Sequence, residues 1–390
     1  MIPYGKQNIN EADIQAVVDV LRSDFITQGP AIERFEKALA DYCGVQYAIA
    51  VNSATAALHI ACLAAGLKPG DRLWTTPITF VASANCGLYC GADVDFVDIN
   101  PQTYNMSVEA LAQKLETADK EGKLPRIVIP VHLAGQSCEM AEIRALSKRY
   151  GFQVIEDASH AVGGRYRNHP VGGCEFSEMA VFSFHPVKII TTGEGGVVLT
   201  NREDLYQKLI RVRSHGITRD PKWMTKPSEG SWYYQQLELG FNYRMTDIQA
   251  ALGHSQMSRL DAFVAKRHAL VERYNQKLAA LPVTLPFQHP DSWSAYHLYI
   301  IRLQTGKLKQ SHAEIFEGLR QAGIGVNLHY IPVHLQPYYQ QLGFRAGDFP
   351  EAEKYYREAI SLPLYPDLTE TQQDMVVSAL EKLVSVTAGV

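Results

Sequence analysis

The sequence lacks any apolar run that approaches the roughly 20 residues needed to cross a bilayer. Its first residues, Met1 to Lys6, lack the apolar core of a signal peptide. The six cysteines show no paired C-x-x-C spacing, which argues against both a disulfide framework and a zinc site. These absences predict a cytoplasmic protein with reduced cysteines in its core, no membrane partner and no metal.

An excess of positive charge is also missing, because the formal net charge of the 390 residues is −4 at pH 7. Such a balance provides no extended field for nucleic acid, so any phosphate site must be local. Repeats, low-complexity tracts and flexible linkers are absent. A chain of this length with 46% hydrophobic residues can build two domains, and the lack of a linker predicts that they pack tightly.

The apolar pattern divides the chain into two parts. Between residues 47 and 200 short apolar runs alternate with helical patterns, which is typical of an α/β fold with a mostly parallel sheet. From Thr246 a helical pattern continues to about Leu281, which is long for one globular helix, so we expect it to bend or to bridge domains. Mixed helix and strand patterns follow, including a strand-like run over 326–330. We therefore predict a large α/β domain over residues 1–250 and a bridging helix with a small α+β domain over 251–390.

Two residues suggest a site for pyridoxal phosphate. Lys188 follows a strand-like run that ends at Ser183, and Asp157 ends another that begins at Gln153. A lysine amine can form an imine with the cofactor's aldehyde, and a carboxylate can keep its pyridine nitrogen protonated so that the ring withdraws electrons. A carboxylate at the end of a strand is often only a helix cap or a solvated loop acid. The partner lysine favours the cofactor interpretation.

A phosphate site is predicted where an alanine-rich helix follows the strand that ends at Val51. The small residues 52–58 open this helix, and its first N–H groups could receive a phosphate. Taken alone, Ser53 or Thr55 would merely cap the helix, and Ser183 would be an ordinary turn serine. The glycines of 193–196 do not have the spacing of a phosphate loop, so we expect a tight strand-to-strand turn there.

Three ring-bearing residues have two interpretations each. Phe80 could stack on the pyridine ring, although an aromatic residue in such a segment is equally consistent with the core. His160 could donate a hydrogen bond to the cofactor's phenolic oxygen, whereas an isolated histidine is more often structural. For His185 we predict the structural role.

In their order along the chain, these segments resemble the DegT/DnrJ/EryC1/StrS family of sugar aminotransferases, which have the aspartate-aminotransferase fold. The resemblance runs nearly end to end and includes the segments 25–30, 52–58, 79–80, 156–160, 182–188, 240–244 and 361–363. The segments 2–6, 185–196 and 329–334 are most similar to a subgroup that acts in pseudaminic acid biosynthesis. Dehydratase relatives have histidine where this chain has Lys188, so the resemblance favours amino transfer.

The resemblance also implies roles for individual residues. Lys188 would carry the cofactor and Asp157 would contact its ring nitrogen, with the other contacts supplied by Ala54, Thr55, Phe80, His160 and Ser183. Asn242 would reach the phosphate in the partner subunit of a homodimer. Residues near the sugar nucleotide would be Lys6, Phe25, Ile26, Thr27, Gln28, His329 and Tyr330.

The reaction implied is a ping-pong transfer from L-glutamate to the C4 ketone of a nucleotide-linked 4-keto-6-deoxy sugar. The expected substrate is UDP-2-acetamido-2,6-dideoxy-β-L-arabino-hex-4-ulose. Two alternatives stay open: an aminotransferase for another dTDP- or GDP-linked ketosugar, and a regulatory protein that binds the cofactor without turnover.

Overall fold

A seven-stranded sheet forms the centre of the computed structural model, which describes residues 1–384. The strands lie in the order β1-β9-β8-β5-β4-β2-β3, and in this sheet only β9 runs antiparallel to its neighbours. Their bounds are β1 Tyr47–Val51, β2 Arg72–Thr75, β3 Asp93–Phe96, β4 Ile127–Val128, β5 Gln153–Asp157, β8 Met179–Ser183 and β9 Gly196–Thr200. The predicted α/β class with a mostly parallel sheet is confirmed.

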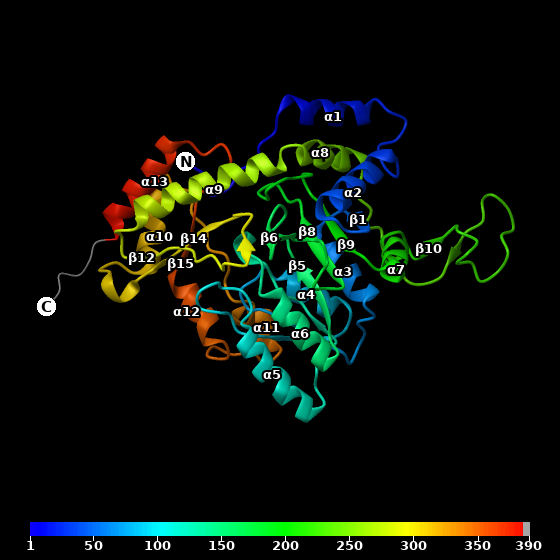
Figure 1. Ribbon diagram of the computed structural model, residues 1–390, viewed down its shortest axis with the longest axis horizontal. Helices are drawn as coiled ribbons and strands as arrows, with labels where there is room; N and C mark the ends of the chain where they lie inside the picture. The colour runs from blue at the N-terminus through cyan, green and yellow to red at the C-terminus, as the bar shows by residue number, and fades with distance from the viewer. Residues whose placement is uncertain (385–390) are drawn as a thin grey trace.

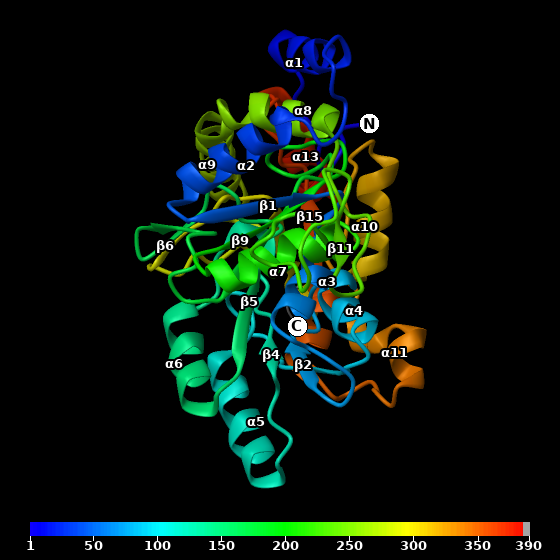
Figure 2. The same cartoon turned by 90° about the vertical axis from the view of Figure 1, so that its right-hand side faces the viewer.

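Helices cover both faces of this sheet (Figures 1 and 2). Because side chains alternate along a strand, Ile127 and Ile155 pack with the helices on one face, whereas Val128 and Val154 pack with those on the other. The first face carries α3 Ala54–Ala64, α4 Ala82–Tyr89 and α7 Glu203–Arg213, and the second carries α5 Val108–Glu121 and α6 Met140–Tyr150. All six cysteines are free and five of them are buried, as predicted.

A smaller sheet with the order β12-β14-β15 forms the C-terminal part, and all its pairs are antiparallel. Its apolar side chains pack with helix α9 Leu260–Leu278 and with helices α10 and α13 around a separate core. The bounds are β12 Val283–Thr284, β14 Tyr299–Leu303, β15 Ala359–Leu362, α10 His312–Gln321, α11 Pro337–Gln341, α12 Pro350–Glu358 and α13 Glu370–Leu383. The domain boundary predicted after residue 250 falls inside a helix and stays a prediction.

One sequence-based expectation about these elements is refined and another is wrong. The long helical pattern from Thr246, for which a bend or a bridge between domains is expected, consists of two helices, α8 Asp247–Met257 and α9 Leu260–Leu278, because the chain turns at Arg259 (φ −111°, ψ 0°). The strand expected over 326–330 is irregular, since only Asn327 forms a bridge, with Ser361 of β15. Local apolar patterns do not reveal which of these segments has a neighbouring strand to pair with.

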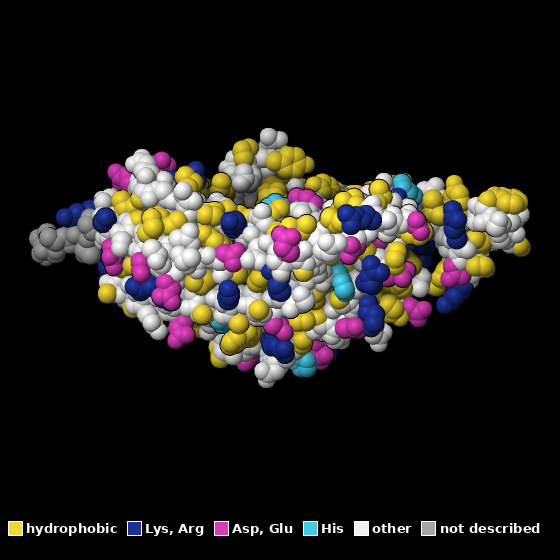
Figure 3. Space-filling view, turned by 90° about the horizontal axis from the view of Figure 1, so that it is seen from above, with side chains coloured by type: hydrophobic (Ala, Val, Ile, Leu, Met, Phe, Trp, Pro, Cys, Tyr) yellow, Lys and Arg dark blue, Asp and Glu magenta, His cyan; other side chains and the backbone are white. Residues whose placement is uncertain are grey.

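The remaining elements extend from this framework. They are α1 Glu11–Leu21, α2 Pro30–Cys43, β6 Arg165–Tyr166, β7 His169–Pro170, β10 Ile217–Thr218, β11 Gln235–Gln236 and β13 Ser292–Trp293. The segment around β10 and β11 projects from the body of the molecule at the right of Figure 1. Viewed from the side of α1 and α8, acidic and basic side chains are interspersed on the surface (Figure 3). No helix within residues 1–384 is long and apolar enough to span a membrane.

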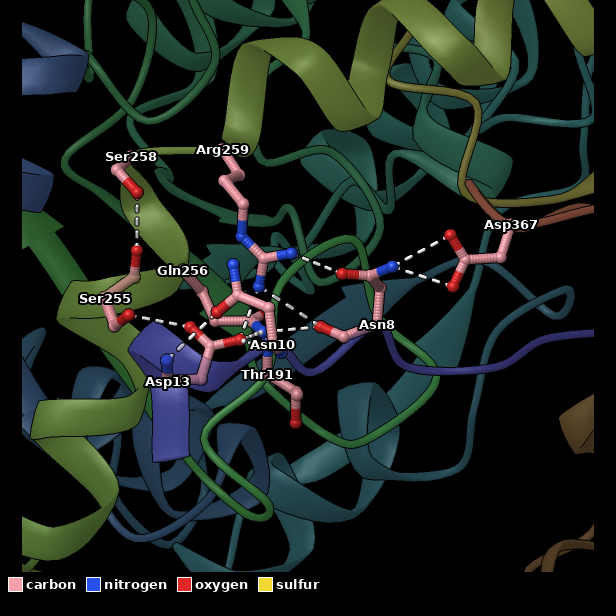
Figure 4. Close-up of polar contacts among 9 residues, drawn as sticks. All are labelled: Asn8, Asn10, Asp13, Thr191, Ser255, Gln256, Ser258, Arg259 and Asp367. Carbon is pink, nitrogen blue, oxygen red and sulfur yellow. Dashed lines mark hydrogen bonds and ion pairs between the residues drawn. The ribbon is translucent and has the colours of Figure 1, made fainter. Parts of the chain in front are cut away.

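The turn between α8 and α9 is held by a cluster of polar side chains (Figure 4). The fully buried carboxylate of Asp13 in α1 accepts hydrogen bonds from Ser255 (2.7 Å), Gln256 (2.9 Å) and Arg259. Gln256 also donates to the carbonyl of Asn8 at 2.8 Å and accepts from the N–H of Thr191 at 3.3 Å. The cluster therefore ties the N-terminal segment to the loop that follows β8.

We predict that Asp13→Ala lowers the free energy of unfolding by about 3 kcal/mol, because it leaves the Arg259 guanidinium without its buried carboxylate. Urea denaturation followed by circular dichroism measures the change. Asp19→Ala is the matched control, since Asp19 is an exposed carboxylate of the same helix, and its effect should stay within about 0.5 kcal/mol. Equal midpoints for the two variants would contradict the assigned role of Asp13.

Candidate active site

A cavity of about 620 Å³ lies where β1, β5 and β8 end and α3 begins. Such a position, beyond the carboxyl ends of the strands, is where open α/β sheets bind ligands. The structure brings nine of the sequence-predicted residues together in the cavity wall: Ala54, Thr55, Phe80, Asp157, His160, Ser183, Lys188, His329 and Tyr330. The wall therefore combines segments from nearly the whole chain, from Tyr4 to Tyr330.

Lys188 presents its amine to this cavity from the loop between β8 and β9. Burial of the amine lowers its pKa from 10.5 to about 8, and the nearby Asp157 carboxylate partly opposes this shift. The loop is fixed by backbone bonds from Lys188 to the carbonyl of His185 and from Thr192 to that of Phe184, at 2.9 and 3.0 Å. About a tenth of the amine is therefore neutral at pH 7, far more than for an exposed lysine.

Asp157 lies at the end of β5 with both carboxylate oxygens engaged. One oxygen accepts a hydrogen bond from the hydroxyl of Ser83 at 2.5 Å, and the other accepts from the N–H of Ser159 at 3.1 Å. Ser83 in turn lies 2.7 Å from the hydroxyl of Thr79. These contacts orient a carboxylate that is buried in the cavity wall.

The start of α3 forms another part of the wall. Ser53 caps the helix, since its hydroxyl accepts from the N–H of Ala56 at 3.1 Å, which is the simpler of the two interpretations for this residue. The N–H groups of Ala54 and Thr55 have no partner within the helix, as at any helix start. Gly196 pairs with Ser183 across β8 and β9, and a Cβ on Gly196 would lie 2.6 Å from the nitrogen of Ala54. The strand pair therefore presses directly against the helix start, and glycine permits this approach.

Three histidines in the wall are neutral. Burial lowers the pKa of His329 to about 3, and burial together with the nearby Lys188 amine moves the pKa values of His160 and His297 well below 6.5. His329 lies 2.8 Å from the hydroxyl of Ser361 through Nδ1. The buried Nδ1 of His297 has no hydrogen-bond partner in the described part of the chain.

Phe80 lies at the edge of the cavity with 59% of its surface exposed, so it is not a core residue. Its ring centre is 6.3 Å from that of Tyr330. An exposed aromatic ring beside Asp157 and Lys188 can stack on a planar ligand.

The other predicted residues lie outside the cavity wall. Lys6 and Asn242 are exposed, as are Phe25 (54%) and Ile26 (53%). This group consists of Lys6, Phe25, Ile26, Thr27, Gln28 and Asn242. None of these six residues lines the cavity of its own chain. A role at the site therefore requires a ligand that extends beyond the cavity, or a second chain.

Sequence reasoning missed several wall residues, among them Tyr4, His297 and Asn327. It also missed Ser83, which lies behind the wall and donates a hydrogen bond to Asp157. Ser83 was within a segment singled out for Phe80, but nothing local indicates a hydrogen bond to a residue 74 positions away. The structural role predicted for His185 does not describe its position, because its exposed ring lines the cavity.

The wall fits pyridoxal phosphate. A partly neutral amine, an oriented carboxylate, a helix start with free N–H groups and an exposed aromatic ring match the aldehyde, ring nitrogen, phosphate and ring face of that cofactor. Such a set defines the class of pyridoxal-phosphate enzymes with a lysine attachment.

Comparison with known proteins places the chain within this class. Residues 7–381 match the DegT/DnrJ/EryC1/StrS aminotransferase family, and the chain belongs to that family. It is a sugar aminotransferase that uses pyridoxal phosphate.

Relatives match along almost the whole chain. The UDP-4-amino-4,6-dideoxy-N-acetyl-beta-L-altrosamine transaminase of Campylobacter jejuni is 36% identical over 390 residues, and 98% of each chain is covered. The spore coat polysaccharide biosynthesis protein SpsC of Bacillus subtilis is 37% identical, with 98% of this chain and 97% of the relative covered.

Solved structures share the fold. Helicobacter pylori PseC, an aminotransferase involved in the biosynthesis of pseudoaminic acid, has a TM-score of 0.87 and 31% identity, covering 98% of this chain and 99% of that chain. Spr1654 of Streptococcus pneumoniae in its PMP form has a TM-score of 0.89 and 29% identity, with the same coverage, and it has also been solved in a PLP form.

We predict that Gly196→Ala weakens pyridoxal phosphate binding by about tenfold, because the added methyl group would displace the N–H of Ala54 and weaken one hydrogen bond. Absorbance titration of the cofactor-free protein measures the affinity. Gly306→Ala is the control, since its Cβ would meet no atom within 4 Å. Unchanged affinity in a Gly196→Ala protein with a native circular dichroism spectrum would contradict a phosphate site at this helix start.

Proposed function

We propose that the protein transfers the amino group of L-glutamate to the C4 ketone of a nucleotide-linked 4-keto-6-deoxy sugar in the cytoplasm. The substrate we favour is UDP-2-acetamido-2,6-dideoxy-β-L-arabino-hex-4-ulose. The observation that carries the proposal is the partly neutral amine of Lys188 facing the carboxylate of Asp157 in one cavity. The choice of sugar is supported by the similarity to the C. jejuni transaminase and to PseC.

Lys188 is the proposed catalytic base and attachment point. When bound, pyridoxal phosphate supplies an aldehyde that carries the amino group and a ring that stabilises negative charge on the neighbouring carbon. The Lys188 amine moves a proton between substrate and cofactor, a task that needs the neutral form which burial favours. Asp157, oriented by Ser83, keeps the ring nitrogen protonated.

The other wall residues hold and orient the ligands in this proposal. The N–H groups of Ala54 and Thr55 with the Ser183 hydroxyl bind the phosphate, because an anion is favoured at a helix start. Phe80 stacks on the ring. The sugar part lies toward His329 and Tyr330, with Lys6 and residues 25–28 assigned to the nucleotide.

The proposed active unit is a homodimer in which Asn242 reaches the partner's phosphate. Asn242 is exposed, and it follows the projecting segment around β10 and β11. That segment exposes Trp232 (71%), Tyr234 (51%) and Leu239 (79%). Large apolar side chains gathered on a projection are typical of a surface that another chain covers.

One assay distinguishes this function from the two alternatives. The protein is incubated with pyridoxal phosphate, L-glutamate and each candidate UDP-, dTDP- or GDP-linked ketosugar, and the products are weighed by mass spectrometry. We expect a gain of about 1 Da on the UDP-linked 4-ketosugar as C=O becomes CH–NH₂, together with release of 2-oxoglutarate. Lys188→Ala should abolish both.

The remaining outcomes select an alternative. Amination of only a dTDP- or GDP-linked sugar would contradict the choice of substrate but leave the aminotransferase assignment intact. Cofactor binding without 2-oxoglutarate release on any candidate would favour the regulatory function. Turnover by Lys188→Ala equal to that of the unaltered protein would refute the role of Lys188.

A second prediction concerns the two chains of the dimer. If each site takes Lys188 from one chain and Asn242 from the other, Lys188→Ala and Asn242→Ala are each defective alone. A hybrid of the two variants then contains one site with both native residues, so mixing them after dissociation should restore activity. Each hybrid dimer therefore has one active site at most, because its other site carries both substitutions.

The complementation test has a direct control. Mixing Lys188→Ala with Asp157→Ala should restore nothing, because both residues belong to the same chain's cavity and every hybrid site lacks one of them. If Asn242 served its own chain, its hybrid with Lys188→Ala would also stay inactive. That result would remove Asn242 from the proposed site.

A further inference from the structure

The position of one proton in the cavity wall follows from the contacts of His160. The backbone N–H of Ala134 donates to Nδ1 of His160 at 3.2 Å, so that nitrogen carries no hydrogen. A neutral imidazole with Nδ1 as the acceptor has its single proton on Nε2. Burial and the nearby Lys188 amine keep the pKa of His160 well below 6.5, so the ring stays neutral.

This proton determines the direction of the next hydrogen bond. Nε2 of His160 lies 3.1 Å from the hydroxyl oxygen of Tyr330, and with the proton on Nε2 the hydroxyl is the acceptor. The opposite direction would place the proton on Nδ1, pointing at the N–H of Ala134. The hydroxyl proton of Tyr330 is thereby left for a group inside the cavity, which both residues line.

We propose that Tyr330 is a catalytic-site hydrogen-bond donor to a ligand oxygen, and that His160 sets this direction instead of contacting the ligand oxygen through its own N–H. The inference rests on the proposed function and deepens it. The acceptor of this hydrogen bond is an electron-rich oxygen of a ligand in the cavity. Two ligands could provide it: the cofactor through its phenolic oxygen, or the sugar through its keto oxygen.

The donor at Ala134 is held in place by a second layer of contacts. Ala134 has a left-handed backbone (φ 59°, ψ 5°). The N–H of the preceding residue, Leu133, donates to the side-chain oxygen of Asn105 at 2.9 Å. His132 lies 2.7 Å from the carboxylate of Glu156 and accepts from the N–H of Cys138 at 3.1 Å. The loop over 131–138 is therefore fixed at both ends.

Glu156 supports this loop from the far face of β5. Adjacent residues of a strand point to opposite faces, so Glu156 turns away from the cavity while Asp157 faces it. The Glu156 carboxylate also accepts from Ser177 at 2.5 Å. Through His132, these contacts hold the loop that carries the Ala134 donor.

The first experiment measures the proton directly. Ring ¹⁵N NMR of the cofactor-free protein, with the His160 signals assigned by difference from His160→Gln, should show a bare Nδ1 and a protonated Nε2. A proton on Nδ1 would overturn the inference. This measurement does not depend on turnover, so it separates failure of the inference from failure of the proposed function.

The second experiment finds the acceptor with Tyr330→Phe, which removes only the hydroxyl group. A shift in the pH titration of the bound cofactor's absorbance, without substrate, would identify the phenolic oxygen. An unchanged titration with about tenfold weaker binding of the UDP-ketosugar to the PMP form, measured by calorimetry, would identify the sugar. No change in either measurement would overturn the inference.

Coupling between the two residues gives a final test. His160→Asn should produce a change of the same kind as Tyr330→Phe, and the double variant should show less than the sum of the two changes because they act on one hydrogen-bonded chain. Additive effects would contradict the role of His160 in orienting Tyr330. Tyr338→Phe, which alters an exposed tyrosine at 57% exposure, is the control and should leave both measurements unchanged.

Discussion

Exclusion of water around the Lys188 amine is the constraint on which the site depends. An ammonium group in water would stay protonated up to a pKa near 10.5, whereas the walls of this cavity bring the pKa to about 8. The same burial keeps three nearby histidines neutral, so their ring nitrogens act as fixed acceptors and donors and add no positive charge. The surrounding sheet and helices serve mainly to close this space.

Close approach of backbone to backbone makes such a closed space possible. Gly196 brings the β8–β9 pair against the first residues of α3, which leaves no room for a side chain between strand and helix. Ser183 therefore lies beside the free N–H groups of the helix. Because Lys188 follows Ser183 by five residues in the loop after β8, fixing Ser183 also limits where Lys188 can be.

The alternation of apolar runs predicted the large sheet, and strand-end residues such as Asp157 and Ser183 predicted the site at its edge. The sequence could not predict contacts set by the tertiary fold. The bond from Ser83 to Asp157 and the entry of His297 into the cavity wall depend on how distant segments meet. The length of the pattern from Thr246 allowed a bend, but its position at Arg259 could not be predicted, since an apolar period is insensitive to a side chain drawn toward Asp13.

The polar cluster of Figure 4 joins residues that are far apart in the sequence. Gln256 contacts both Asn8 and Thr191, and Asn8 also donates to Asp367 at 2.7 and 2.8 Å. A replacement at one of these positions leaves a donor or acceptor on another segment without its partner. The physical coupling means that these positions constrain one another's evolution, and we expect them to covary among relatives even though none of them touches the ligand cavity.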